Sequence, residues 1–304
     1  MERIPVFYNY SIDCELPPDG KFGGPSTWEV AERSTRGFID LMESLGLLQG
    51  ASLFVYPDVA LHQRSLFREM ADRGIEIGLH LNSMRYSRMQ EPAWLGSLSY
   101  QQQVEVLRMA KSDLEDVIGR PVLGFRACYA SANHATFPAV EDTGFQWTST
   151  SGNGNYRPEV FECWSGAWPF SYHPSRKNML VPGDMQIYEM PINHGIRLHF
   201  QGDPNRRLDM RAETPLHISG PFYAAWWQLI EENLLEMEKR DQPVRAIIAA
   251  SHNTSLYGDP DSLAHRNVTR VGELVREICE LKGYAFVPAT FLAIRQEAGR
   301  VSAF

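Results

Sequence analysis

The sequence predicts an α/β fold, a barrel or near-barrel of about seven parallel strands in one domain. Short apolar runs alternate with amphipathic segments along most of the 304 residues. Repeated strand–helix units of this kind imply parallel strands that are joined by right-handed crossovers. The length suits a single α/β barrel, and hydrophobic residues make up 43% of the chain, so a sizeable core can be buried.

The first half of the chain contains the most regular units. An apolar run occupies residues 4–12. The next segment ends at Gly46 and has apolar residues at helical spacing, namely Val30, Phe38, Leu41, Met42 and Leu45. Further strands are predicted at 51–56, 75–81, 121–127 and 145–150. Helices are predicted between them at 61–74, 99–119 and 134–144.

The second half begins with a different composition. Residues 151–219 are rich in Gly, Pro, Asn and aromatic side chains, with one strand-like run at 186–193. The segment is too long for a simple connection, so we expect an irregular, functional insertion within a single domain over residues 1–304. Regular alternation then returns, with helices at 220–240 and 261–283, a buried strand at 244–251 and a closing run at 284–294.

Charge and composition exclude several classes of partner. The net charge is −8 and the pI is about 5.6, which argues against nucleic acid or an anionic membrane as the partner. No apolar run is long enough to span a membrane, and the N-terminus does not resemble a signal peptide. The cysteines are far apart: Cys14, Cys128, Cys163 and Cys279. We therefore expect a cytoplasmic protein with reduced thiols and a small-molecule or glycan substrate; its oligomeric state stays open.

Polar side chains follow four of the predicted strands. Asp13 and Glu15 follow the first apolar run, and His80, Arg126 and His252 follow three others. Singly, each residue also fits a turn, a cap or a surface ion pair. Because active sites of such folds lie at the carboxyl ends of the strands, the set together predicts a site.

These residue types suit hydrolysis. A carboxylate can take a proton from water, and a histidine can give a proton to a leaving amine. An acid and a second histidine can hold a divalent metal, which polarises a carbonyl. An arginine can orient the basic carboxylate and hold it ionised.

Four motifs occur in the order and rough spacing of a known family. "SIDCE", "EIGLH", "GFRACY" and "IIAASH" resemble the NodB-homology polysaccharide deacetylases, carbohydrate esterase family 4, over about residues 4–292. "REMADRGIEIGLH" and "FRACYASANHATFPAVEDTGF" are the most specific parts. The resemblance implies a distorted (β/α) barrel. It also implies that Asp13 is the catalytic base, Arg126 its orienting partner, and His252 the acid. The backbone N–H of Tyr129 would help to form the oxyanion hole.

The metal motif departs from the family pattern. The resemblance assigns Glu15 and His80 as ligands of zinc or a similar divalent metal. The family has a second histidine four residues after the first, where this chain has Met84. A thioether is a poor ligand for such an ion, so the third ligand is unassigned, with the amide oxygen of Asn82 as one candidate.

The insertion contains candidate substrate-binding residues. Trp164 and Trp168 fit a platform on which a sugar ring stacks, and His194 follows the strand-like run. The other interpretation of these aromatic side chains is that they pack the long loop onto the barrel.

These residues favour a hydrolase of non-peptide C–N bonds. We expect an N-deacetylase of an N-acetylated sugar or glycan precursor. One alternative is a metal-independent, ring-opening amidohydrolase of a ureide or cyclic imide, as in the allantoinase-like members of the superfamily. Another is a catalytically degenerate, carbohydrate-binding member. The missing histidine supports both alternatives.

Overall fold

The computed structural model describes residues 3–214 and 221–301, which divide into two compact units. The terminal unit comprises Met1–Ile12, Pro17–Ser52 and Ile192–Phe304. The central unit comprises Asp13–Leu16 and Leu53–Pro191. The single domain predicted over residues 1–304 stays a prediction.

The main sheet has the strand order β10-β1-β2-β3-β4-β5-β8, and β9 pairs with β1. The pairings β1–β10, β3–β4, β4–β5 and β5–β8 are parallel. The strands are β1 (Pro5–Cys14), β2 (Ala51–Val55), β3 (Glu76–Leu81), β4 (Gly124–Ala127), β5 (Trp147–Thr148), β8 (Tyr188–Glu189), β9 (Arg245–His252) and β10 (Ala285–Pro288). Strands β1 to β5 are neighbours in chain order, and helices lie between them along the chain, so the predicted fold class, a distorted (β/α) barrel, is confirmed.

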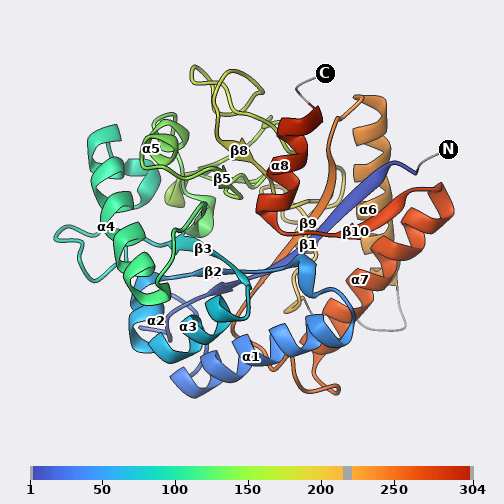
Figure 1. Cartoon of the computed structure of the whole chain (residues 1–304). Helices are drawn as coiled ribbons and strands as arrows, with labels where there is room; N and C mark the ends of the chain where they lie inside the picture. Colours follow the sequence, from blue (N-terminus) through green and yellow to red (C-terminus); the bar gives the residue numbers. More distant parts are fainter. Residues whose placement is uncertain (1–2, 215–220, 302–304) are drawn as a thin grey trace. The chain divides into compact units, whose positions relative to one another are not determined.

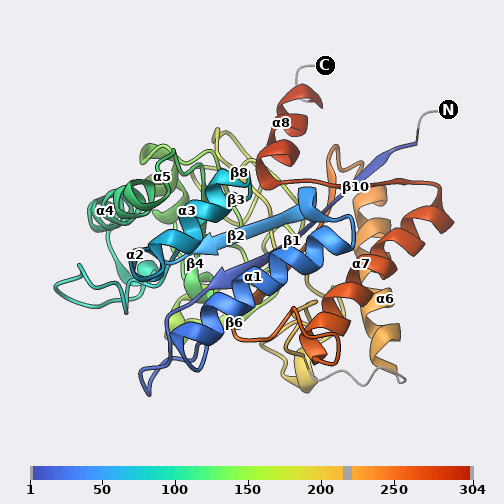
Figure 2. The ribbon, with the colours of Figure 1, turned by 60° about the horizontal axis from the view of Figure 1, so that its bottom comes forward.

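The helices of the terminal unit are α1 (Trp28–Ser44), α6 (Pro221–Lys239), α7 (Leu263–Lys282) and α8 (Phe291–Val301). Side chains cap the starts of α1 and α7: Thr27 accepts from the N–H of Val30, and Ser262 accepts from that of His265. Helices α6 and α7 run side by side (Figure 2). Helix α8 was not predicted. Thr290 accepts from the N–H of Ala293 and so starts a helix where the sequence suggested only a closing run.

The helices of the central unit are α2 (Pro57–His62), α3 (Arg64–Asp72), α4 (Tyr100–Ile118) and α5 (Thr136–Asp142). Helix α4 packs against the other three (Figure 1). It begins with a capping box between Ser99 and Gln102 and ends at Gly119, whose φ of 72° suits a residue without Cβ. These are the start and end that the sequence predicted.

The register of β3 and β4 positions the site. His80 lies opposite Arg126, and Leu79 lies opposite Phe125. Residues opposite each other in neighbouring strands project to the same face of a sheet. Farther back, Gly124 lies opposite Trp147, whose ring occupies the space that a Cβ at Gly124 would need. The pairing of β3 with β4 therefore places His80 and Arg126 opposite each other, on the same face of the sheet.

The predicted insertion is irregular in the structure. Residues 151–214 contain the antiparallel pair β6 (Tyr156–Arg157) and β7 (Glu162–Cys163), and β8 is only two residues long. Residues 215–219 of the insertion lie outside the described part. Side chains satisfy some backbone groups of this stretch; Glu189, for example, accepts from the N–H of Ser151.

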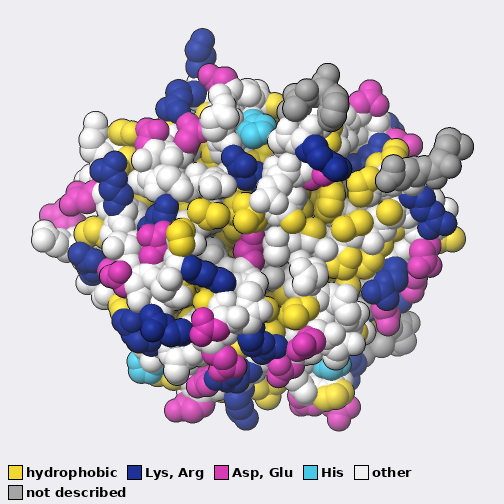
Figure 3. Space-filling model, viewed as in Figure 1, with side chains coloured by type: hydrophobic (Ala, Val, Ile, Leu, Met, Phe, Trp, Pro, Cys, Tyr) yellow, Lys and Arg dark blue, Asp and Glu magenta, His cyan; other side chains and the backbone are white. Residues whose placement is uncertain are grey.

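Within residues 3–214 and 221–301, no helix is long and apolar enough to cross a membrane. Positive and negative side chains are interspersed over the face shown in Figure 3. The predicted cytoplasmic location stays a prediction.

Candidate active site

Asp13 and Arg126 form a buried ion pair in the central unit. Nη1 of Arg126 donates to Oδ1 of Asp13 at 2.7 Å. The Arg126 side chain is 2% exposed and the Asp13 side chain is 11% exposed. Ser149 accepts from two further Arg126 donors: Nε donates to its carbonyl oxygen and Nη2 to its hydroxyl. The guanidinium also stacks on the ring of Phe54, 3.7 Å from its centroid. Asp13 is therefore held by a cation that is itself fixed on several sides.

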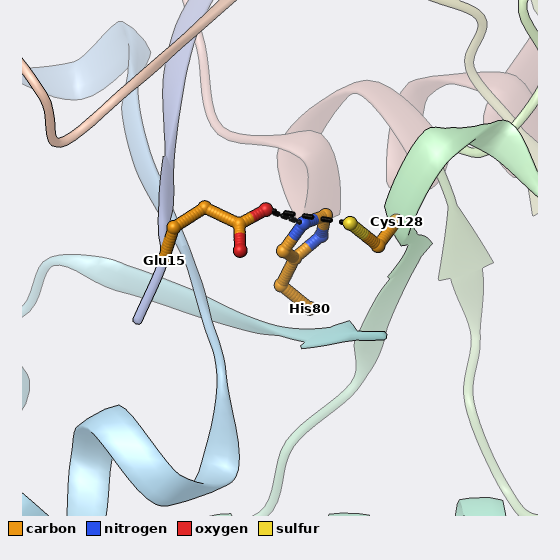
Figure 4. Close-up of side chains that lie close together, drawn as sticks. All are labelled: Glu15, His80 and Cys128. Carbon is orange, nitrogen blue, oxygen red and sulfur yellow. Dashed lines mark hydrogen bonds and ion pairs between the residues drawn. The ribbon is translucent and has the colours of Figure 1, made fainter. Parts of the chain in front are cut away.

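Glu15, His80 and Cys128 form a second cluster beside this pair. They come from the residue after β1, from β3 and from the residue after β4, and their side chains point toward one another (Figure 4). Nε2 of His80 lies 3.0 Å from Oε1 of Glu15, and Sγ of Cys128 lies 3.4 Å from the same oxygen. Nε2 of His80 also lies 3.8 Å from Oδ2 of Asp13. The predicted strand-end residues of the central unit thus meet at one place.

The carboxylates at this site favour a positively charged group beside them, either a protonated His80 or a bound cation. Burial lowers the pKa of His80, but Asp13 and Glu15 outweigh burial and leave that pKa raised. Burial, with Glu15 and Asp13 adding to it, raises the pKa of the Cys128 thiol well above its usual value. Two carboxylates next to one guanidinium leave the site with an excess of negative charge, which a proton on His80 or a bound cation can balance.

The donor atoms of this cluster fit a metal ion. A carboxylate oxygen, an imidazole nitrogen and a thiol sulfur lie within 4.8 Å of one another. These are the three ligand types that zinc prefers, and bonds of about 2.0–2.3 Å in a tetrahedral site place neighbouring ligand atoms about 3.3–3.6 Å apart. The distances from Glu15 to His80 and Cys128 are close to that spacing. Cys128 would have to lose its proton to bind the ion.

Cys128 was not among the candidate metal ligands of the sequence analysis. Asn82 was one candidate; its side-chain oxygen accepts from the backbone N–H of Met84 at 3.1 Å, and its role as a ligand stays a prediction. Cys128 lies in the cluster. Its position directly after the strand that carries Arg126 could have indicated Cys128 as a site residue. The spacing of the cysteines from one another does not indicate it.

The turn after β4 has an unusual backbone. Tyr129 and Ala130 have φ values of 56° and 52°, in the left-handed region that residues with a Cβ seldom adopt. Strained backbone of this kind often occurs at functional sites, since the surrounding structure must hold it. The Tyr129 side chain is 36% exposed and contacts the ring of Trp94 edge-on. The oxyanion role of its N–H stays a prediction.

His252 lies at the end of β9 in the terminal unit, where a carboxylate holds it. Nδ1 of His252 lies 3.0 Å from Oε1 of Glu213. Glu213 also accepts from the backbone N–H of His252 and the hydroxyl of Ser251. Burial alone would raise the pKa of Glu213, but His252, Ser251 and Arg211 lower it to about 2. Sequence reasoning missed Glu213 because it lies in the irregular segment, where no periodicity marks it.

The three predicted substrate-binding residues differ in exposure. Trp164 has no exposed surface, and its indole N–H donates to the carbonyl of Ala130. A ring inside the core cannot stack on a sugar, so we now assign Trp164 to packing of the loop. Trp168 is half-buried and packs edge-on against Phe170. His194 is 6% exposed, with Nδ1 next to the carbonyl of Ile192. The roles of Trp168 and His194 stay predictions.

Comparison with known proteins agrees with the resemblance seen in the sequence. Residues 24–148 match the polysaccharide deacetylase family model. No curated protein matches the chain.

Solved structures with a similar fold include the following three. A protein from Mycobacterium smegmatis that is assigned as a polysaccharide deacetylase has a TM-score of 0.60 at 16% identity, over 99% of this chain and 91% of that one. An allantoinase, PuuE, has a TM-score of 0.61 at 11% identity, over 98% and 92%. A protein from Pseudomonas aeruginosa PAO1, also assigned as a polysaccharide deacetylase, has a TM-score of 0.58 at 12% identity, over 98% and 92%. At these identities the likeness concerns the fold alone.

Proposed function

We propose that this member of the polysaccharide deacetylase superfamily hydrolyses non-peptide C–N bonds, as an N-deacetylase of an N-acetylated sugar or glycan precursor. The family match supports a hydrolase of the deacetylase or amidohydrolase type. The choice of substrate and the roles of single residues are our proposal.

One observation carries this proposal. The Asp13 carboxylate is fixed by Arg126 at 2.7 Å and lies beside the cluster of Glu15, His80 and Cys128. A general base needs to be ionised and correctly oriented, and a buried arginine meets both needs. A role only in binding sugar would not require a buried carboxylate–guanidinium pair, which is costly to desolvate.

The side chains then divide the reaction among them. Asp13 takes a proton from the attacking water, and Arg126 keeps Asp13 in place. The backbone N–H of Tyr129 donates to the oxygen that gains negative charge. His252, oriented by Glu213, gives a proton to the leaving amine. A metal ion held by Glu15, His80 and Cys128 would supply a Lewis acid for the substrate carbonyl.

A second candidate function is ring opening of a ureide or cyclic imide without a metal. Two features of the metal region favour it. Met84 stands where the family has its second histidine. The buried Nδ1 of His80 has no hydrogen-bond partner among the described residues, whereas a metal-bound histidine usually donates its other N–H to an acceptor. In this alternative, His80 donates from Nε2 to Glu15 and no ion is needed.

Metal analysis and a substrate panel test both candidates. Metal content is measured on purified protein before and after chelation. The released acetate, amine or ring-opened product is then measured for N-acetylated sugars, sugar nucleotides, ureides and cyclic imides. We expect acetate release that stops on chelation and returns with zinc. Turnover of a ureide or imide that survives chelation would favour the second candidate. Sugar binding without turnover of any substrate would contradict both.

A further inference from the structure

The segment after β5 holds Arg126 in its position. Residues 149–151 follow β5 directly. The carbonyl and hydroxyl of Ser149 accept from Arg126 at 3.0 and 2.9 Å. The hydroxyl of Thr150 accepts from the backbone N–H of Ala127 at 3.1 Å. The orientation of Arg126 toward Asp13 therefore depends on the conformation of this short segment.

Glu189 of β8 fixes that segment in turn. Its Oε1 accepts from the N–H of Thr150 at 3.0 Å, and from the N–H and hydroxyl of Ser151, each at 2.7 Å. Glu189 has no exposed surface, and burial raises its pKa to about 7 although these donors oppose the rise. A fully buried carboxyl group is costly, and a chain tolerates it where donors surround it.

We propose that Glu189 is a positioning residue for catalysis: by fixing residues 149–151 it holds Arg126 against Asp13. The inference rests on the proposed function, since the Asp13–Arg126 pair is what it serves. Glu189 touches neither Asp13 nor substrate in this role. It acts through three consecutive links, from its carboxylate to residues 149–151, to Arg126, and to Asp13.

A purely structural role makes different predictions. Glu189 lies opposite Thr148 in the parallel pairing of β5 and β8, so it could merely join two short strands. Its replacement would then lower thermal stability without a specific effect on turnover. A positioning role instead predicts a loss of kcat that is shared with Arg126.

A double-mutant cycle separates the two roles. Glu189→Gln keeps the shape of the side chain and an acceptor oxygen, and Arg126→Lys weakens the other end of the chain of contacts. We expect Glu189→Gln to lower kcat about tenfold with KM little changed, and the double variant to lose far less than the product of the two single effects. Ser151→Ala, which removes one donor and buries no new charge, should act in the same direction more weakly. It keeps the test open if Glu189→Gln does not fold.

Glu141→Gln is the matched control. Glu141 is also a carboxylate of the central unit that accepts from backbone N–H groups, those of Gln186 and Ile187, but it lies on α5. Its replacement should leave kcat unchanged. A lower melting temperature with unchanged kcat in Glu189→Gln, or effects that multiply independently with those of Arg126→Lys, would overturn the proposal.

A readout without turnover keeps this proposal distinct from the proposed function. Exchange of the Arg126 Nε–H proton with water can be followed by ¹⁵N–¹H NMR, with the signal assigned by its loss in Arg126→Lys. We expect slow exchange in the wild type and exchange about tenfold faster in Glu189→Gln. Unchanged exchange would refute the positioning role even if the enzyme is active. If no C–N substrate is turned over, the proposed function fails, while faster exchange still supports the link from Glu189 to Arg126.

Discussion

Two carboxylates of this chain are paired with basic side chains in different ways. Asp13 and Arg126 are buried, with the arginine side chain 2% exposed and donors directed to Asp13 and Ser149. Glu213 and His252, in the terminal unit, are partly buried but more exposed, with side chains 25% and 35% exposed, respectively. Arginine keeps its charge at any ordinary pH, whereas histidine exchanges protons near neutrality. The first pair is suited to hold a carboxylate, and the second is suited to deliver a proton.

The largest expected change in stability follows from breaking the buried Asp13–Arg126 pair. Arg126→Ala leaves Asp13 buried without its cation, so we expect unfolding free energy to fall by about 3–5 kcal/mol in denaturant titrations. His252→Ala breaks the more exposed pair and should cost about 0–1 kcal/mol, because solvent screens it. Similar losses in the two variants would remove the distinction between the pairs.

Replacement of Cys128 tests whether the central unit contains a zinc site. If its thiolate is a ligand, Cys128→Ser should weaken zinc binding by more than about tenfold, measured by competition with a chelator of known affinity. Cys163→Ser is the control, since Cys163 is half-buried in β7 and outside the cluster. Equal zinc affinity in both variants would exclude Cys128 as a ligand, and an absence of zinc from the wild type would favour the metal-independent alternative.

The Glu213–His252 pair should make the stability of the protein depend on pH in the acidic range. The pKa of Glu213 in the folded chain is lowered from 4.5 to about 2, so the unfolded chain binds its proton first as pH falls. The stability that Glu213 contributes is therefore present above pH 4.5 and is lost as pH falls toward 2. Because the side chain is partly exposed, we expect a contribution of at most about 1–2 kcal/mol.

Glu213→Gln measures that contribution. The difference in unfolding free energy between wild type and Glu213→Gln should shrink steadily between pH 4.5 and 2, while groups common to both proteins cancel. A difference that stays constant over this range would mean that the neighbours of Glu213 in the folded chain do not stabilise its ionised form.

The sequence predicted the parts of the site that depend on strand ends. Asp13, His80 and Arg126 could be grouped because parallel strands finish at the same edge of a sheet, and the structure brings these three together. Periodicity also predicted most helices, since their caps and apolar faces are local. The roles of these residues are still predictions.

The contacts that sequence reasoning missed join distant segments. Glu189 bonds Ser151 across 38 residues, and Glu213 bonds His252 across 39. Glu189 lies in the short strand-like run 186–193 and Glu213 in irregular chain, and in neither place does the sequence pattern mark an acid as buried. Trp164 shows a related limit of prediction from sequence. Composition identified it as an aromatic residue of a loop, but only packing decides whether its ring is exposed.

The central claim is that Asp13 is the base of a C–N hydrolysis. The most direct test is kcat/KM of Asp13→Asn for a substrate that the wild type turns over, with folding checked by circular dichroism. Asp142→Asn is the control, because Asp142 is exposed on α5 and accepts from Tyr100 at the surface. We predict a loss of about 10²–10⁴-fold for Asp13→Asn and an unchanged value for Asp142→Asn. A folded Asp13→Asn variant with activity close to that of the wild type would contradict the account.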